Sequence, residues 1–188
     1  MPNRFIRTDG RRASLASLAL ALLLGTATHS SLAQTGWEQD FDDENKPWAE
    51  IAIQLPPPVA AENLLPFEVS ATATQSFAID AKSLTLGSDG VIRYTLVATS
   101  PSGVRNISYE GIRCATFERK LYAFQHADGN WSRARNTDWQ RITRNAANRQ
   151  HATLAKEYFC SGLTVAGNAQ QMLERIRWQH PLSDMLSQ

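Results

Sequence analysis

The sequence of 188 residues has only two cysteines, and they do not form a Cys-x-x-Cys pair. A thiol–disulfide oxidoreductase and a zinc module are therefore not expected, because the first needs that pair and the second needs about four clustered ligands. Neither sign of charge dominates, since 19 basic face 18 acidic side chains. This balance gives no indication of nucleic acid as a partner. No apolar run approaches the ~20 residues of a membrane span.

Motifs of the common enzyme classes are also missing. The chain has no Gly-x-Ser-x-Gly elbow, no phosphate loop, no His-Glu-x-x-His and no haem attachment site. Its acidic stretch lacks the alternating acids and central glycine of a calcium loop. The sequence therefore predicts no catalytic residue, no cofactor and no metal site, and it favours a non-enzymatic binding or structural module.

Residues 1–33 have the features of a cleaved signal peptide. Four arginines precede an apolar core from Leu15 to Leu24, and Ser31-Leu32-Ala33 offers small residues where a signal peptidase cleaves. Arg11-Arg12 would also fit twin-arginine export, and an ordinary secretory signal is the simpler alternative. We therefore expect a periplasmic protein without a transmembrane segment after cleavage.

Residues 34–62 form an acidic and proline-rich extension. Between Trp37 and Glu50 six carboxylates face one lysine, and Pro56 to Pro58 favour extended polyproline geometry. Two interpretations stay open. The extension is a solvated tail whose Trp48 and Leu55 pack against the domain, or its aromatic residues engage a partner, as in an adhesin-like interaction module.

An antiparallel meander is predicted from Gly90 to Phe124. Apolar and polar residues alternate in Val91–Thr99, which is typical of a half-buried strand. Turn residues separate it from two further β-prone runs, and Asp80 and Ser83 are expected to cap a turn between earlier strands. The other predicted strands are Pro66–Ser70, Ser76–Ile79, Leu84–Leu86, Val104–Cys114 and Thr116–Phe124.

Two helices are predicted in the C-terminal third. Residues 146–158 carry an apolar stripe, and Asn168–His180 begins with Asn168 and Gln171 at the spacing of a capping box. The fold class is thus α+β: a single domain with a curved antiparallel sheet of about five or six strands and one or two C-terminal helices packed on one face. We place the domain at residues 63–165 and a C-terminal helix and tail at 166–188.

Cys114 and Cys160 are expected to form one structural disulfide. Two cysteines far apart in an exported chain usually pair in this way. The bond would tie the end of a central strand to the end of the first predicted helix.

The C-terminal region is basic, with twelve basic and six acidic side chains over residues 105–177. Arginine interleaved with tryptophan can bind anionic groups and stack on flat ones. The candidate binding surface consists of Arg133, Arg135, Trp139, Arg141 and Arg144. The sequence does not identify a partner for this surface. One interpretation is a solvated face that pairs partly with the acidic extension; the other is a surface for an anionic cell-envelope component or another envelope protein.

An envelope hydrolase with an unfamiliar site is the competing function. It would require Glu110, His151 or Glu157 to converge in one concave pocket. His151 lies on the apolar stripe of its predicted helix, where a histidine is usually a packed core residue.

The chain resembles the cryptic neisserial protein-like (CNP-like) family of exported bacterial proteins, whose function is uncharacterised. The most specific matches are Glu62-Asn63-Leu64-Leu65-Pro66 and the run from Ser108 to Cys114, and the ending Glu157-Tyr158-Phe159-Cys160 also fits. A looser likeness, to small exported proteins of the surface-adhesin E type, covers Ile79-Asp80 and the two cysteines. The resemblance implies export and no particular activity.

Overall fold

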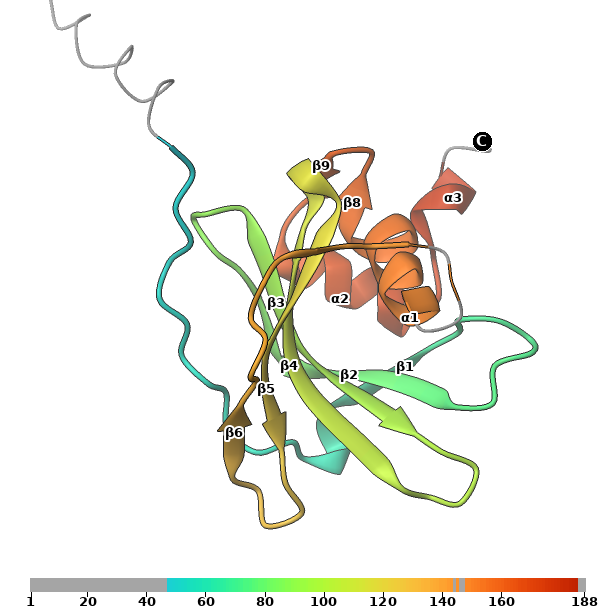
Figure 1. Ribbon diagram of the computed structural model, residues 1–188. Coiled ribbons are helices and arrows are strands. Elements are labelled where there is room, and N and C mark those ends of the chain that lie inside the picture. Colours follow the sequence, from blue (N-terminus) through green and yellow to red (C-terminus); the bar gives the residue numbers. More distant parts are fainter. Residues whose placement is uncertain (1–46, 144, 146–147, 186–188) are drawn as a thin grey trace, which may run out of the picture. The chain divides into compact units, whose positions relative to one another are not determined.

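The computed structural model describes residues 47–143, 145 and 148–185, and its main feature is a curved, seven-stranded antiparallel sheet (Figure 1). Six strands follow one another in the order β1-β2-β3-β4-β5-β6, and β7 pairs with the other end of β5. Their bounds are β1 Leu64–Phe67, β2 Ser76–Leu86, β3 Val91–Thr99, β4 Arg105–Arg113, β5 Glu118–Gln125, β6 Trp131–Arg133 and β7 Gln140–Arg141. The predicted signal peptide and residues 34–46 of the extension lie outside the described residues.

Helices from the C-terminal third cover one face of the sheet (Figure 1). α1 and a π-helical segment, η4, are continuous and lead into a short hairpin, after which α2 contacts β1 and β2. The bounds are α1 Arg149–Thr153, η4 Leu154–Phe159, β8 Cys160–Ser161, β9 Thr164–Val165, α2 Ala169–Arg177 and α3 Leu182–Met185; two 3-10 turns, Ala61–Asn63 and Cys114–Thr116, precede β1 and β5. The predicted α+β fold, with helices packed on one side of an antiparallel sheet, is confirmed. No helix in the described ranges is long and apolar enough to cross a membrane.

Side-chain alternation in the central strands produces two different faces. Ile92, Tyr94 and Leu96 of β3 belong to the main core, which they share with Phe159 of η4 and Met172 of α2. The intervening residues of β3 point to the other side, as expected for a period of two. This second face holds a smaller aromatic cluster of Tyr109, Tyr122 and Ala123.

Strand β2 is one strand where the sequence predicted two. Its pairing with β3 shifts register between Asp80 and Thr85. The Ser83 hydroxyl donates to the Asp80 carbonyl and accepts from the Thr95 N–H of β3, while the Asp80 carboxylate accepts from the Lys82 N–H. The local capping that the sequence predicted is therefore present, but it closes a bulge inside a strand and does not end one.

The helix predicted from residue 146 begins later, at Arg149, and changes to a π-helix at Leu154. The predicted stripe of His151, Leu154, Ala155 and Tyr158 is buried in the main core. Ala147 of that stripe lies outside the described residues.

Helix α2 carries the capping box that the sequence predicted. The Asn168 side chain accepts from the Gln171 N–H, and the Gln171 side chain accepts from the Asn168 N–H. Met172 and Ile176 are fully buried. Arg175 donates to the Tyr158 carbonyl at the end of η4 and to the Ala166 carbonyl after β9, so α2 also satisfies backbone acceptors outside itself.

The predicted disulfide between Cys114 and Cys160 is confirmed. It joins the end of β4 to the start of β8, and both sulfurs lie in the main core. In the chain-entropy view, closing a loop with a sequence separation of 46 residues stabilises the fold by about 4 kcal/mol.

The second face of the sheet is covered by residues 47–60, here called the N-terminal strap, which runs along the side opposite the helices (Figure 1). Ile53 and Leu55 pack against Tyr109 and Tyr122, and the Trp131 indole N–H donates to the Pro56 carbonyl at 2.9 Å. At its beginning, the Trp48 ring is stacked 3.7 Å from the Arg113 guanidinium. Trp48 and Leu55 thus pack on the domain, as the first of the two interpretations expected.

Candidate functional site

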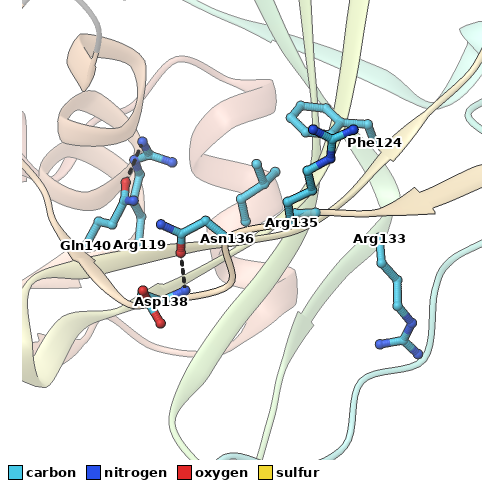
Figure 2. A pocket seen from close by; sticks show the side chains of 9 residues that line it. Arg119, Phe124, Arg133, Arg135, Asn136, Asp138 and Gln140 are labelled. Atoms are coloured by element: carbon cyan, nitrogen blue, oxygen red, sulfur yellow. Dashed lines mark hydrogen bonds between the residues drawn. The ribbon is translucent and has the colours of Figure 1, made fainter.

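The candidate site lies where the sheet edge at β5 changes its partner. β6 pairs with Ala123–Gln125, β7 pairs with Glu118 and Arg119, and the chain between them, residues 134–139, leaves the sheet. A cavity of about 490 Å³ lies inside this excursion. Its polar lining comes from Arg119, Arg133, Arg135, Asn136, Asp138 and Gln140, and its apolar lining from Leu121, Phe124 and Ala134 (Figure 2).

Arg119 is held in place at the wall of the cavity. Its Nε donates to Asn148 Oδ1 at 3.0 Å and its Nη2 to Gln140 Oε1 at 3.2 Å. Both acceptors are neutral amides, so the hydrogen bonds orient the guanidinium without neutralising its charge. The Arg119 charge acts on the buried Glu110 carboxylate, but no ion pair joins it to a described carboxylate. A guanidinium positioned in this way favours a carboxylate or phosphate group nearby.

Arg135 supplies a second uncompensated charge. It is exposed, and no hydrogen bond or ion pair joins it to another described residue. Figure 2 shows it on the same side of the excursion as Phe124, whose ring is 45% exposed and leaves an apolar wall open to solvent. Across the cavity, Asn136 Oδ1 accepts the Asp138 N–H at 2.8 Å and fixes the turn. The lining as a whole holds three guanidiniums against one carboxylate.

A second cavity of about 380 Å³ lies between the same excursion and the N-terminal strap. Arg133 and Ala134 line both cavities, while Glu50, Lys120 and Thr137 line only the second. In Figure 2 the Arg133 side chain points away from Arg135 and toward the strap. Arg133 therefore stands between the two cavities.

Glu50 anchors the strap beside the second cavity. Its carboxylate accepts from Lys120 Nζ and from the Tyr122 hydroxyl, each at 2.6 Å, and lies 3.6 Å from Arg93 Nη2. Partial burial opposes ionisation of Glu50, but the hydrogen bonds from Lys120 and Tyr122 and the two positive charges outweigh it and hold its pKa below the usual 4.5. For Tyr122, burial and the Glu50 carboxylate both raise the pKa.

Asp89 forms the companion anchor. It accepts two hydrogen bonds from the Arg93 guanidinium, at 3.1 and 2.5 Å, and one from the Ile51 N–H of the strap at 3.1 Å. Burial opposes its ionisation, yet the bonds from Arg93 and the backbone keep its pKa below the usual 3.8. The Trp48 indole N–H also donates to the Asp89 carbonyl. The charges of this face are thus used to hold the strap.

The structure divides the predicted Arg/Trp surface. Arg133 and Arg135 come together at the first cavity. Trp139 instead packs edge-on against Trp48, with ring centroids 6.0 Å apart, and Lys120 lies 5.7 Å from its ring. Arg141 is exposed in β7 opposite Glu118, and Arg144 lies outside the described residues.

Arg119 and Phe124 are cavity residues that no motif in the sequence distinguishes. Both lie on β5, and their part in the cavity depends on which strands flank that edge. The only sequence signal was the basic character of residues 105–177, which includes Arg119 without distinguishing it.

Glu110 and His151 do meet, but they meet in the interior. His151 Nε2 lies 2.7 Å from Glu110 Oε2, the Ser108 hydroxyl donates to Oε1 at 2.7 Å, and the Tyr94 hydroxyl donates to Oε2 at 3.2 Å. Burial opposes ionisation of Glu110; the charge and hydrogen bond of His151 and the Ser108 hydroxyl outweigh it, so the pKa of Glu110 is lowered.

This buried pair is not arranged as a catalytic site. Glu110 and His151 are 5% and 3% exposed, and neither lines the cavities described above. Glu157 of η4, the third residue of the hydrolase hypothesis, accepts from the Ser183 hydroxyl of α3. Within the described part of the chain, no group of three or more histidines, cysteines or carboxylates could hold a metal ion.

Fold and cavity together define a small, disulfide-linked α+β protein with a basic cavity at one sheet edge. The chain belongs to the CNP1-like family, whose model matches residues 43–177. This span includes the N-terminal strap and both cavities, and it confirms the resemblance noted in the sequence. Searches among curated proteins and among solved structures found no match.

Proposed function

We propose that this protein is an exported, periplasmic binding protein, without enzymatic activity, that recognises an anionic group of a cell-envelope component through the cavity at β5. The observation that carries the proposal is the pairing of a fixed guanidinium, Arg119, with an unpartnered one, Arg135, around about 490 Å³ of space. Cavities of about 300–1,000 Å³ are the usual size of small-ligand sites.

Export is supported by three features. Residues 1–33 have the pattern of a cleavable signal peptide, with a basic start, an apolar core and small residues at the end. The Cys114–Cys160 bond fits an oxidising compartment, since structural disulfides persist mainly outside the cytoplasm. The chain also belongs to a family that we expect to be exported.

Binding is favoured over catalysis by the composition of the cavity. Its polar groups are three guanidiniums, two amides and one carboxylate, Asp138, which lies beside the amide of Asn136. Acyl transfer or hydrolysis calls for a nucleophile or a general base in hydrogen-bond reach of the substrate. The Glu110–His151 pair, which has that chemistry, is enclosed by the core.

Calorimetric titration of the processed protein with a uronic-acid disaccharide and with inorganic phosphate tests the proposal. We expect binding that weakens as salt is raised and that falls about 10- to 100-fold in Arg135→Ala, the range for losing one charge-assisted hydrogen bond. Arg177→Ala, which removes the same charge from the exposed end of α2, should bind as the wild type does. Equal affinities in both variants would place the anion elsewhere.

A further inference from the structure

The two cavities are parts of one continuous edge. Arg133 and Ala134 line both of them, and the excursion of residues 134–139 is the wall between them. Because the Arg133 side chain turns toward the strap while Arg135 stays with the first cavity (Figure 2), cationic groups follow the edge from one cavity to the other.

The charge along this edge repeats. The first cavity has Arg119, Arg133 and Arg135 against Asp138. In the second, Lys120 and Arg133 face Glu50, whose carboxylate is already bound to Lys120. When Arg133 is counted once, with the second cavity, each cavity keeps an excess of one positive charge. A ligand with one anionic group would use only one of these places, whereas a ligand with regularly spaced anionic groups would use both.

The neutral lining indicates what kind of chain carries those groups. Asn136 and Gln140 are exposed and present amide groups to solvent beside the charges. Such groups hydrogen-bond to sugar hydroxyls. Apolar surface is limited to short patches such as Phe124 and Leu121 in the first cavity and Ile51 and Ile53 in the second, which suits sugar faces better than a long acyl chain.

We propose that the edge binds an extended anionic glycan, whose carboxylate or phosphate groups occupy the first cavity at Arg119 and Arg135 and the second at Arg133. This inference rests on the proposed function, since it takes the first cavity as an anion site. It adds that the ligand is a chain and that its length determines the affinity.

The test compares uronic-acid oligomers from two to eight units by calorimetry at constant ionic strength. The octamer should bind at least about tenfold tighter than the disaccharide, because its additional carboxylates reach the second cavity and bind there at a high effective concentration. Thr137→Glu places a negative charge in the second cavity only. It should weaken octamer binding about tenfold, through like-charge repulsion, and leave disaccharide binding within about twofold.

Thr137→Gln is the matched control, because it has the same size as the glutamate without the charge; it should behave as the wild type with both ligands. Octamer and disaccharide affinities that are equal, yet still depend on Arg135, would overturn this inference and leave the proposed function standing. Failure of every oligomer and of phosphate to bind would overturn both. Retention on phosphatidylglycerol vesicles, with no oligomer bound, would assign the edge to a membrane surface and also refute the glycan.

Discussion

At the residue scale, the interior of this protein depends on one polar cluster. Glu110 of β4 accepts hydrogen bonds from Ser108 and Tyr94 and lies against His151 of α1, with all four side chains buried. A buried carboxylate is costly without such partners, and the cluster supplies them. It therefore fixes α1 against the sheet at one defined position.

His151→Ala should destabilise the fold by about 3–5 kcal/mol, because it leaves the Glu110 carboxylate buried without its main partner. Urea denaturation at neutral pH measures the free energy of unfolding. The double variant with Glu110→Gln should recover part of the loss, since the uncompensated charge is then gone. A single-variant loss under about 1 kcal/mol would show that the pair contributes little.

The same cluster predicts a direction for the pH dependence. Since the pKa of Glu110 in the folded protein is lower than its usual 4.5, its ionisation contributes stability that is present above that value and lost as the pH falls below it. Glu110→Gln should therefore show a shallower loss of unfolding free energy than the wild type on acidification toward pH 3. Parallel curves for the two proteins would contradict this assignment.

At the element scale, the N-terminal strap replaces a second layer. One face of the sheet is covered by helices, and the other by extended chain that is held through Glu50, Asp89 and the Trp131–Pro56 hydrogen bond. Extended chain has few contacts of its own, so its position depends on these anchors. Lys120 and Tyr122, which bind Glu50, also line the second cavity, and strap and cavity are thus coupled.

Glu50→Gln should loosen the strap at neutral pH without unfolding the domain. The change removes the charge that pairs with Lys120 and Arg93. The pKa of Glu50 is below the usual 4.5 in the folded protein, so protonation of Glu50 in acidic solution below that value weakens the same contacts and should have the same effect. Hydrogen exchange of the Ile51 amide, which donates to Asp89, and of the Trp48 indole measures the effect. Exchange as slow as in the wild type would mean that the strap is held by Asp89 and the other contacts without the Glu50 charge.

The elements also show how far the sequence could lead. Alternation predicted β3 and the meander because burial on one face enforces a period of two, and the capping box predicted the start of α2 because it is local. The bulge in β2 was not predicted, because Asp and Ser side chains cap backbone groups in a turn and in a bulge alike. The sequence therefore did not distinguish the two. The first cavity exists because β5 pairs with β6 at one end and with β7 at the other. The sequence does not show this pairing, so it could not distinguish Arg119 from the other arginines.

At the scale of the whole molecule, the disulfide joins the two halves of the fold. Cys114 follows β4 in the middle of the central meander, and Cys160 follows the helical stretch that covers the sheet. Stability of a single domain is about 5–15 kcal/mol in total, so the ~4 kcal/mol from this loop closure is a large share.

Cys114→Ser/Cys160→Ser should lower the free energy of unfolding by about 2–5 kcal/mol, as is usual for loss of a native disulfide in a small domain. Urea denaturation of this variant, and of the wild type with and without reductant, provides the comparison. Reduction should have no further effect on the variant. An unchanged midpoint in reduced wild type would mean that packing alone holds the two halves together.

The central claim is that Arg119 and Arg135 form an anion site, and nuclear magnetic resonance of the arginine side chains tests it most directly. With ¹⁵N-labelled protein titrated with a uronic-acid disaccharide, we expect the Nε–H signals of Arg119 and Arg135 to shift together along one saturable curve, while that of Arg177 stays in place. Shifts confined to other arginines, or equal small drifts of all of them, would contradict the account.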